Sequence, residues 1–184
     1  MDLELRRWTT GDAAALRRAV ATSHDLGLQL GDADLRSEAA CATHIERHWA
    51  TSLADRLDRA ISVDGVAVGH VGLSHIEHRH DTAWASYWVA EAFRGRGLAT
   101  WGLIELTDHA FRDLGLFRLE LGHGVDNIAS CRVAARAGFI TEGIERSKLR
   151  YGDLRFDVET HARLVTDPDV MPNPESPPNG TLLA

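Results

Sequence analysis

The fold of this chain is decided by Arg94-Gly95-Arg96-Gly97-Leu98-Ala99, which lies between a predicted strand and a predicted helix. The strand covers residues 84–89, and the helix covers residues 98–114, where apolar residues recur every three or four positions. The first N–H groups of a helix lack intrahelical partners and carry the positive end of its dipole. Two glycines let the backbone approach a ligand, and two arginines add charge. The run therefore predicts a pyrophosphate-binding turn, the alternative being a tight connection with solvated arginines.

The residues before this turn predict antiparallel strands. Alternating patterns and the Asp64-Gly65 turn signal predict strands at 60–63, 66–76 and 82–89. Further upstream, we expect a strand at 3–8 and helices at 13–20 and 37–53, with an irregular segment at 24–34 between the helices.

The residues after the turn predict a parallel crossover followed by a hairpin. A strand at 117–125, a helix at 128–137 and a strand that begins at residue 139 follow the long helix. Tyr151-Gly152-Asp153 reads as a hairpin turn, and the final strand, 154–164, alternates strictly. The expected fold class is α/β with a mixed sheet, an antiparallel meander followed by a parallel β-α-β crossover and a C-terminal hairpin. Residues 1–165 form one domain, and 166–184, with all five prolines, form a tail.

Composition limits the class of protein. The chain has 184 residues, 26% of them charged, and a formal net charge of −7, which argues against a nucleic acid as partner. No apolar run approaches the length of a membrane span, and the N-terminus has no secretory pattern. The two cysteines, Cys41 and Cys131, read as isolated buried thiols of a reducing compartment. We therefore expect a cytoplasmic protein with no membrane partner.

The order of elements, together with three local motifs, resembles the GCN5-related N-acetyltransferase (GNAT) superfamily over residues 3–164. The run from Arg94 to Ala99 fits the family's R/Q-x-x-G-x-G/A motif. Tyr87-Trp88-Val89 precedes it, like the strand that pairs with the pantetheine arm. Asn127-Ile128-Ala129-Ser130, followed by Gly138-Phe139, is similar to the N-x-x-S…G-F segment. This form and the closing hairpin are similar to the ribosomal-protein alanine N-acetyltransferase branch.

The resemblance implies an enzyme that moves an acetyl group from acetyl-CoA to a primary amine by direct transfer in a ternary complex. The amine is a protein N-terminus or a small molecule. Backbone N–H groups near Val89 would hold the thioester oxygen, an oxyanion-type role. The residues implied to bind acetyl-CoA are Tyr87, Trp88, Val89, Arg94, Gly95, Arg96, Gly97, Leu98, Ala99, Asn127 and Ser130.

The acid and base are less directly implied. Many relatives use a tyrosine as general acid seven residues after the asparagine, but this chain has Ala134 there, so Ser130 is the expected acid. Positions where relatives carry an acidic base hold Trp84 and Lys148-Leu149-Arg150 instead. Glu142 is the expected general base, and the alternatives are Glu145, His70, His75 or a chain of water molecules.

Other patterns bear on metal binding, on alternative functions and on assembly. His75, His78 and His80 cluster in a predicted turn and His44 and His48 lie one helical turn apart, but both sets read as surface or packing residues, so we predict no metal. A non-catalytic acyl-CoA-binding module on the same fold is the alternative function. A nucleotide-phosphate binder ranks last, because no Walker lysine follows the glycines. The final strand and the tail offer edges through which a homodimer can form.

Overall fold

A computed structural model describes residues 2–31, 33–51, 53–170 and 181–182 of the chain. Its elements, in chain order, are β1 (Leu3–Arg6), η1 (Thr10–Asp12), α1 (Ala13–Thr22), α2 (His24–Gln29), α3 (Glu38–His48), β2 (Leu57–Val63), β3 (Val66–Glu77), β4 (Thr82–Val89), η2 (Glu91–Phe93), α4 (Leu98–Arg112), β5 (Arg118–Gly124), α5 (Ile128–Arg136), β6 (Ile140–Tyr151), β7 (Leu154–Leu164) and β8 (Thr181–Leu182).

The strands form one mixed sheet in the order β6-β7-β5-β4-β3-β2-β1-β8. Strands β1 to β4 pair antiparallel, β4 and β5 pair parallel, and β5, β7 and β6 pair antiparallel. The crossover between β4 and β5 is α4, because parallel neighbours need a long connection. The predicted meander, crossover and C-terminal hairpin are confirmed.

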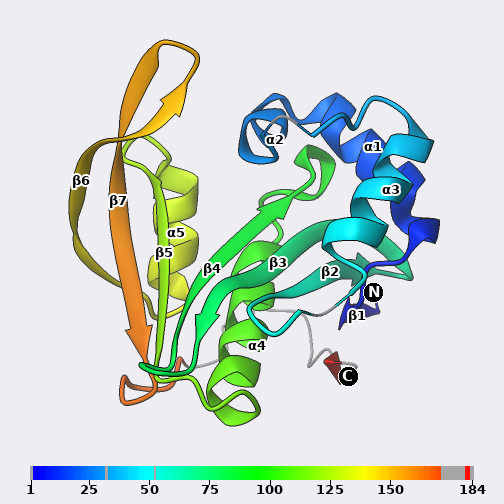
Figure 1. Cartoon of the computed structure of the whole chain (residues 1–184). Helices are drawn as coiled ribbons and strands as arrows, with labels where there is room; N and C mark the ends of the chain where they lie inside the picture. The colour runs from blue at the N-terminus through cyan, green and yellow to red at the C-terminus, as the bar shows by residue number, and fades with distance from the viewer. Residues whose placement is uncertain (1, 32, 52, 171–180, 183–184) are drawn as a thin grey trace.

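Helices cover both faces of the sheet (Figure 1). On one face α4 and α5 bury a core that includes Leu103, Leu106 and Val71. On the other face α1 and α3 bury a second core around Trp8, Leu16 and Ile45. The central strands are therefore covered on both sides, and all seven residues of β2, including Asp58 and Arg59, are buried.

Two glycine-containing turns have the conformation that their sequences predict. Asp64 and Gly65 both have positive φ, 48° and 81°, as a two-residue hairpin turn requires. Gly115 follows α4 with φ 68°, the left-handed conformation in which glycine commonly ends a helix.

The structure corrects several element boundaries. The segment predicted to be irregular contains α2, whose Leu26 is buried in the second core. The helix predicted over 37–53 ends at His48, and the strand predicted from residue 60 begins at Leu57. The ends of helices and strands are the features that local sequence patterns define least sharply.

The C-terminal part also differs from expectation. Strand β7 lies between β6 and β5, so it offers no free edge for a dimer, and β6 is the edge instead. The face of β7 that carries His161 and Arg163 is buried beneath α5, and the Arg163 Nη1 donates to the Ala137 carbonyl at the end of that helix. Of the predicted tail, Thr181–Leu182 pair in parallel with β1, and 171–180 and 183–184 lie outside the described residues. No helix in the described ranges has both the length and the apolar character needed to cross a bilayer.

Candidate active site

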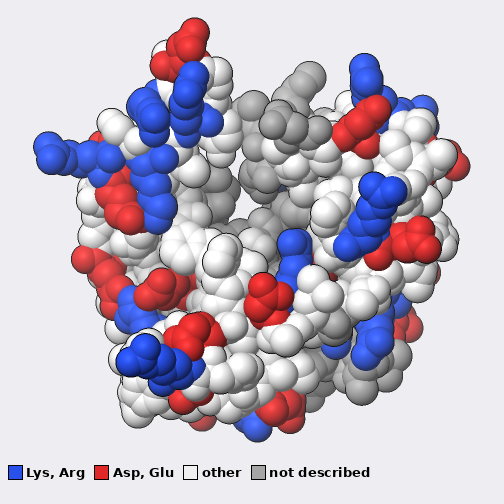
Figure 2. Space-filling view, viewed as in Figure 1, with Lys and Arg blue, Asp and Glu red and all other residues white. Residues whose placement is uncertain are grey.

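A cleft opens where β4 and β5 diverge. The two strands pair only from Thr82 to Trp84 with Arg118 to Glu120, and beyond this point they separate (Figure 1). The cleft has a volume of about 350 Å³ and is lined by the end of β4, the turn before α4 and the first turns of α5. In the space-filling view the opening is a hollow between two arms, with basic and acidic side chains mixed on both (Figure 2). The divergence of the two strands therefore leaves an open slot beside the end of β4.

The glycine turn forms one wall of this cleft. Gly95 and Gly97 have φ values of 77° and 76°, and a Cβ atom on either would meet open space. Helix α4 starts directly after Gly97, and its first helical hydrogen bond runs from the N–H of Trp101 to the carbonyl of Gly97. Residues 98–100 precede that bond and belong to the cleft lining, so their N–H groups have no partner within the helix.

The two arginines of the turn differ in position. Arg94 lines the cleft, and its Nε donates to the carbonyl of Val89 at 3.0 Å. Its Nη2 also donates to both carboxylate oxygens of Asp25, at 2.8 and 2.9 Å. Arg96 turns away, because its Nη2 donates to the carbonyl of Ala92 and its guanidinium lies over the Phe93 ring. The turn therefore presents one arginine to the cleft instead of the predicted two.

The end of β4 presents its backbone to the cleft. The N–H of Ala90 donates to Val68 on β3, and successive residues of a strand point their N–H groups to opposite sides. The N–H of Val89 therefore points toward the gap left by β5. The Trp88 side chain is buried on the opposite face, where its ring is stacked parallel to His70. Of the three predicted residues on this strand, Trp88 can thus contribute only its backbone.

The first turn of α5 carries Asn127 and Ser130, which both belong to the lining of the cleft. The Asn127 Oδ1 accepts a hydrogen bond from the N–H of Ser130 at 3.0 Å and so caps the helix. The Tyr87 hydroxyl donates to the Ser130 carbonyl at 3.0 Å, and burial raises the pKa of Tyr87 to about 12. Because Asn127 performs the capping, the Ser130 hydroxyl is not needed for it.

The contacts of Glu142 argue against its predicted role as general base. Its carboxylate forms a two-pronged ion pair with Arg118, which lowers the pKa of Glu142. Arg118 lies where β4 and β5 are still paired, at the closed end of the gap. A carboxylate held in its charged form by an arginine, away from the cleft, is poorly placed to accept a proton from a substrate.

The alternative bases are also held elsewhere. Glu145 forms an ion pair with Lys148. His70 is buried, its Nδ1 accepts from Trp8 Nε1 at 3.1 Å, and its Nε2 lies 3.3 Å from Asp58. His75 is exposed, next to Ser74. None of these groups belongs to the described lining of the cleft.

Asp25 is one of several residues of the cleft lining that sequence reasoning missed, Arg132 and Arg136 being others. Asp25 lies on α2 and accepts a hydrogen bond from Arg94, which is 69 positions away in the sequence. A single aspartate in a segment predicted to be irregular carries no pattern that would indicate this contact.

We expect Asp25→Asn to strengthen binding of an anionic ligand such as CoA about twofold to fivefold, the range of an exposed ion pair. The substitution frees the Arg94 guanidinium and removes a negative charge from the phosphate site. Calorimetric titration at low and high salt measures this, and the gain should shrink at high salt. Asp34→Asn, which breaks the exposed pair with Arg36 outside the cleft, is the matched control. Weaker binding by Asp25→Asn would instead mean that Asp25 orients Arg94 for the ligand.

Comparison with known proteins places this geometry in a family. Residues 2–140 match the family described as "Acetyltransferase (GNAT) domain". The chain is 29% identical over 118 residues to the "Putative ribosomal N-acetyltransferase YdaF" of Bacillus subtilis, covering 63% of this chain and 64% of that protein. It is 33% identical over 98 residues to the "Ribosomal-protein-serine acetyltransferase" of Escherichia coli, covering 53% and 55%.

A solved structure agrees with the sequence relatives. Mycobacterium smegmatis RimJ, solved in complex with CoA-disulfide, has a TM-score of 0.77 and 27% identity, covering 89% of this chain and 82% of that one. The sequence alignments span less than two thirds of the length of either of the two relatives named above.

Proposed function

The chain belongs to the GNAT acetyltransferase family, and on that premise we propose that it transfers the acetyl group of acetyl-CoA to a primary amine. The observation that carries the proposal is the junction of the glycine turn with the open end of β4. This junction puts an anion site and a free strand edge in one cleft. A CoA thioester has the matching chemistry, a pyrophosphate joined to an amide-containing arm.

Each part of the donor has a partner in the cleft. The N–H groups of residues 98–100 and the Arg94 guanidinium would hold the pyrophosphate. The amide-containing arm would lie along β4, and the N–H of Val89 would donate to the thioester oxygen as negative charge develops there. Binding both substrates side by side supplies much of the acceleration, since it makes the reaction effectively unimolecular.

The transfer step needs one proton donor and one proton acceptor. The neutral amine attacks the thioester carbon, a C–N bond forms, and the C–S bond breaks. Ser130 would donate its hydroxyl proton to the leaving thiolate of CoA. The proton lost by the amine passes to water, which also restores the Ser130 proton.

We infer that the acceptor is the N-terminal amine of a protein. The support is the names of the relatives, two of which are ribosomal acetyltransferases. Small amines remain the alternative acceptors. The proposed catalytic domain is residues 1–165, acting in the cytoplasm. A homodimer, if it forms, would use the β6 edge, where Ile140 and Ile144 are exposed.

Calorimetric titration with CoA and acetyl-CoA, followed by a thiol-release assay, tests the proposal. The acceptor panel contains peptides that begin with serine, alanine or methionine, together with polyamines and amino acids. We expect micromolar binding of both nucleotides and thiol release with N-terminal peptides. Binding without release on the whole panel would favour the non-catalytic module, and absence of binding would exclude the donor assignment.

A further inference from the structure

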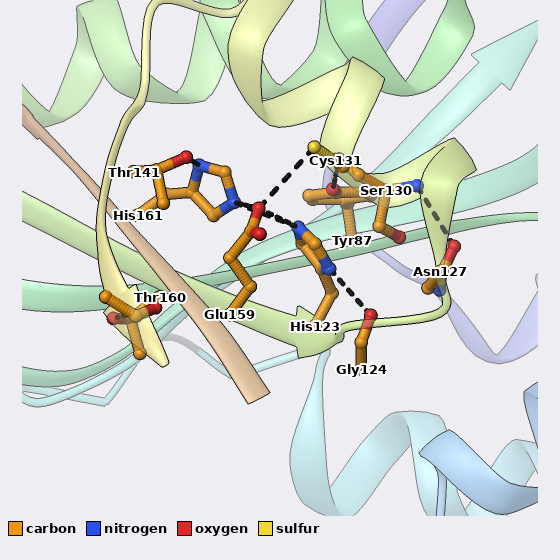
Figure 3. A network of polar contacts seen from close by, with 11 residues as sticks. Tyr87, His123, Gly124, Asn127, Ser130, Cys131, Thr141, Glu159, Thr160 and His161 are labelled. Carbon is orange, nitrogen blue, oxygen red and sulfur yellow. Dashed lines mark hydrogen bonds and ion pairs between the residues drawn. The ribbon is translucent and has the colours of Figure 1, made fainter. Parts of the chain in front are cut away.

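Four side chains with metal-binding atoms meet beneath α5: His123, Cys131, Glu159 and His161 (Figure 3). We call them the His123 cluster. Their ligand atoms all lie within 4.8 Å of one another. The Nε2 atoms of His123 and His161 are 2.9 Å apart, and the Glu159 Oε1 lies 2.9 Å from His161 Nε2 and 3.7 Å from His123 Nε2. The Cys131 Sγ lies 3.5 Å from the same carboxylate oxygen.

The register of the sheet brings these residues together. His123 on β5 pairs directly with Glu159 on β7, and His161 follows Glu159 by two residues, so all three side chains share one face. Helix α5 covers this face and supplies Cys131. Both histidine side chains are almost fully buried, whereas that of Glu159 is 24% exposed. The cluster therefore has a buried interior and a route to solvent beside the carboxylate.

Both histidines make a hydrogen bond through Nδ1, away from the cluster, and turn Nε2 toward its centre. His123 Nδ1 lies 2.9 Å from the Gly124 carbonyl, which can only accept, so Nδ1 carries a proton and the Nε2 of the neutral ring has a lone pair. His161 Nδ1 lies 3.3 Å from Thr141 Oγ1, which can accept or donate. Outer hydrogen bonds of this kind orient metal-binding histidines and fix their tautomers.

We propose that the His123 cluster binds a divalent transition metal ion, Zn²⁺ first, through His123 Nε2, His161 Nε2, Cys131 Sγ and Glu159 Oε1. Two imidazoles, a thiolate and a carboxylate are a ligand set typical of four-coordinate zinc. Tetrahedral bond lengths place such ligand atoms about 3.3 to 3.6 Å apart. The histidine nitrogens, now 2.9 Å apart, would separate by a few tenths of an ångström, and the ligand atoms farthest apart, within 4.8 Å, would draw together by about 1 Å. The thiolate and the carboxylate together neutralise the charge of the ion.

The protons balance without any further reactant. The Cys131 thiol releases its proton to solvent when the sulfur binds the ion. His161 moves its ring proton from Nε2 to Nδ1, where the Thr141 oxygen accepts it. His123 keeps its Nδ1 proton on the Gly124 carbonyl throughout. With both histidines neutral and Glu159 ionised, metal binding thus releases one proton per site, that of the Cys131 thiol.

Such an ion would join β5, β7 and α5, beside the first turn of α5 that lines the cleft. Cys131 directly follows Ser130, whose carbonyl accepts from Tyr87 and whose N–H donates to Asn127. The metal would therefore restrain the segment that carries the proposed acid. The binding inference itself is independent of acetyl transfer, because its readout is metal binding.

Titration of tag-free, chelator-treated protein with Co²⁺ and Zn²⁺ tests the proposal. The background variant His78→Asn/His80→Asn removes exposed histidines that bind metals adventitiously. We expect one Co²⁺ per chain, the visible absorption of a four-coordinate site and a thiolate-to-cobalt charge-transfer band. Stoichiometric Zn²⁺ should displace the Co²⁺ and raise the melting temperature by several degrees.

Single substitutions identify the ligands. Cys131→Ser should abolish the charge-transfer band, and Cys41→Ala, at the chain's other cysteine, should retain it. Cys131→Ser and His161→Gln should each weaken Zn²⁺ binding about a hundredfold or more, and Thr141→Val about tenfold, since loss of an outer partner alone costs about tenfold to a hundredfold.

The Co²⁺ spectrum of the wild-type protein tests the coordination of the ion even where a variant fails to fold. A six-coordinate Co²⁺ spectrum, or a charge-transfer band that survives Cys131→Ser, would overturn the proposal. CoA binding by the same wild-type sample reports separately on the acetyl-CoA site, so the two proposals can fail independently.

Discussion

Gly97→Trp is expected to abolish measurable CoA binding, a loss of at least about a hundredfold, while the protein stays folded. A Cβ atom at this position meets no protein atom within 4 Å, so the indole would project into the cleft that Gly97 lines. There it would cover the first N–H groups of α4, which are the proposed pyrophosphate donors. The positive φ adds a backbone cost of about 1–2 kcal/mol, within the stability of an ordinary domain. Calorimetric titration with CoA measures the loss.

Gly115→Trp provides the matched control. Gly115 also has a positive φ, 68°, and open space around its Cβ position, but it follows the other end of α4 and lies outside the cleft lining. The two variants should lose similar stability in a thermal melt, and only Gly97→Trp should lose CoA. If Gly97→Trp binds CoA with wild-type affinity, the turn does not hold the pyrophosphate.

Those parts of the fold that depend on contiguous residues could be predicted from the sequence. The helical repeat of apolar residues in α4 and the Asp64-Gly65 turn are local signals that the structure confirms. The alternation over residues 154–164 correctly predicts a strand, but the burial of β7 does not alternate. The burial of the polar face of β7 was not predictable in the same way. Arg163 is buried because its Nη1 donates to the Ala137 carbonyl at the end of α5, a contact between residues 26 positions apart.

In the candidate site, too, features made by contiguous residues are predictable and contacts between distant residues are not. The glycine turn is one continuous run, so its position and its helix N-terminus follow from local chemistry. The Asp25–Arg94 pair and the His123 cluster join elements that are distant in sequence, with spacings that match no metal or catalytic motif. The sequence indicates Glu142 as a base only by its residue type. Its ion pair with Arg118 depends on the register of β5 against β7 and of β7 against β6, which the sequence does not reveal.

Ser130→Ala is the second prediction with a large effect, a fall in kcat of about a hundredfold to a thousandfold with CoA affinity unchanged. The helix cap survives, because the N–H of residue 130 still donates to Asn127 Oδ1, and the carbonyl still accepts from Tyr87. Only the hydroxyl is lost, and with it the proposed proton donor to the leaving thiolate.

Steady-state thiol release, with calorimetric CoA binding on the same samples, separates this loss from a loss of binding. Thr43→Ala, on the exposed face of α3, removes a hydroxyl outside the cleft lining and should leave kcat unchanged. Ser130→Thr keeps a hydroxyl at the site and should recover part of the rate. A wild-type kcat for Ser130→Ala would remove Ser130 from the mechanism and leave water to protonate the thiolate. Equal falls in kcat and CoA affinity would make Ser130 a binding residue.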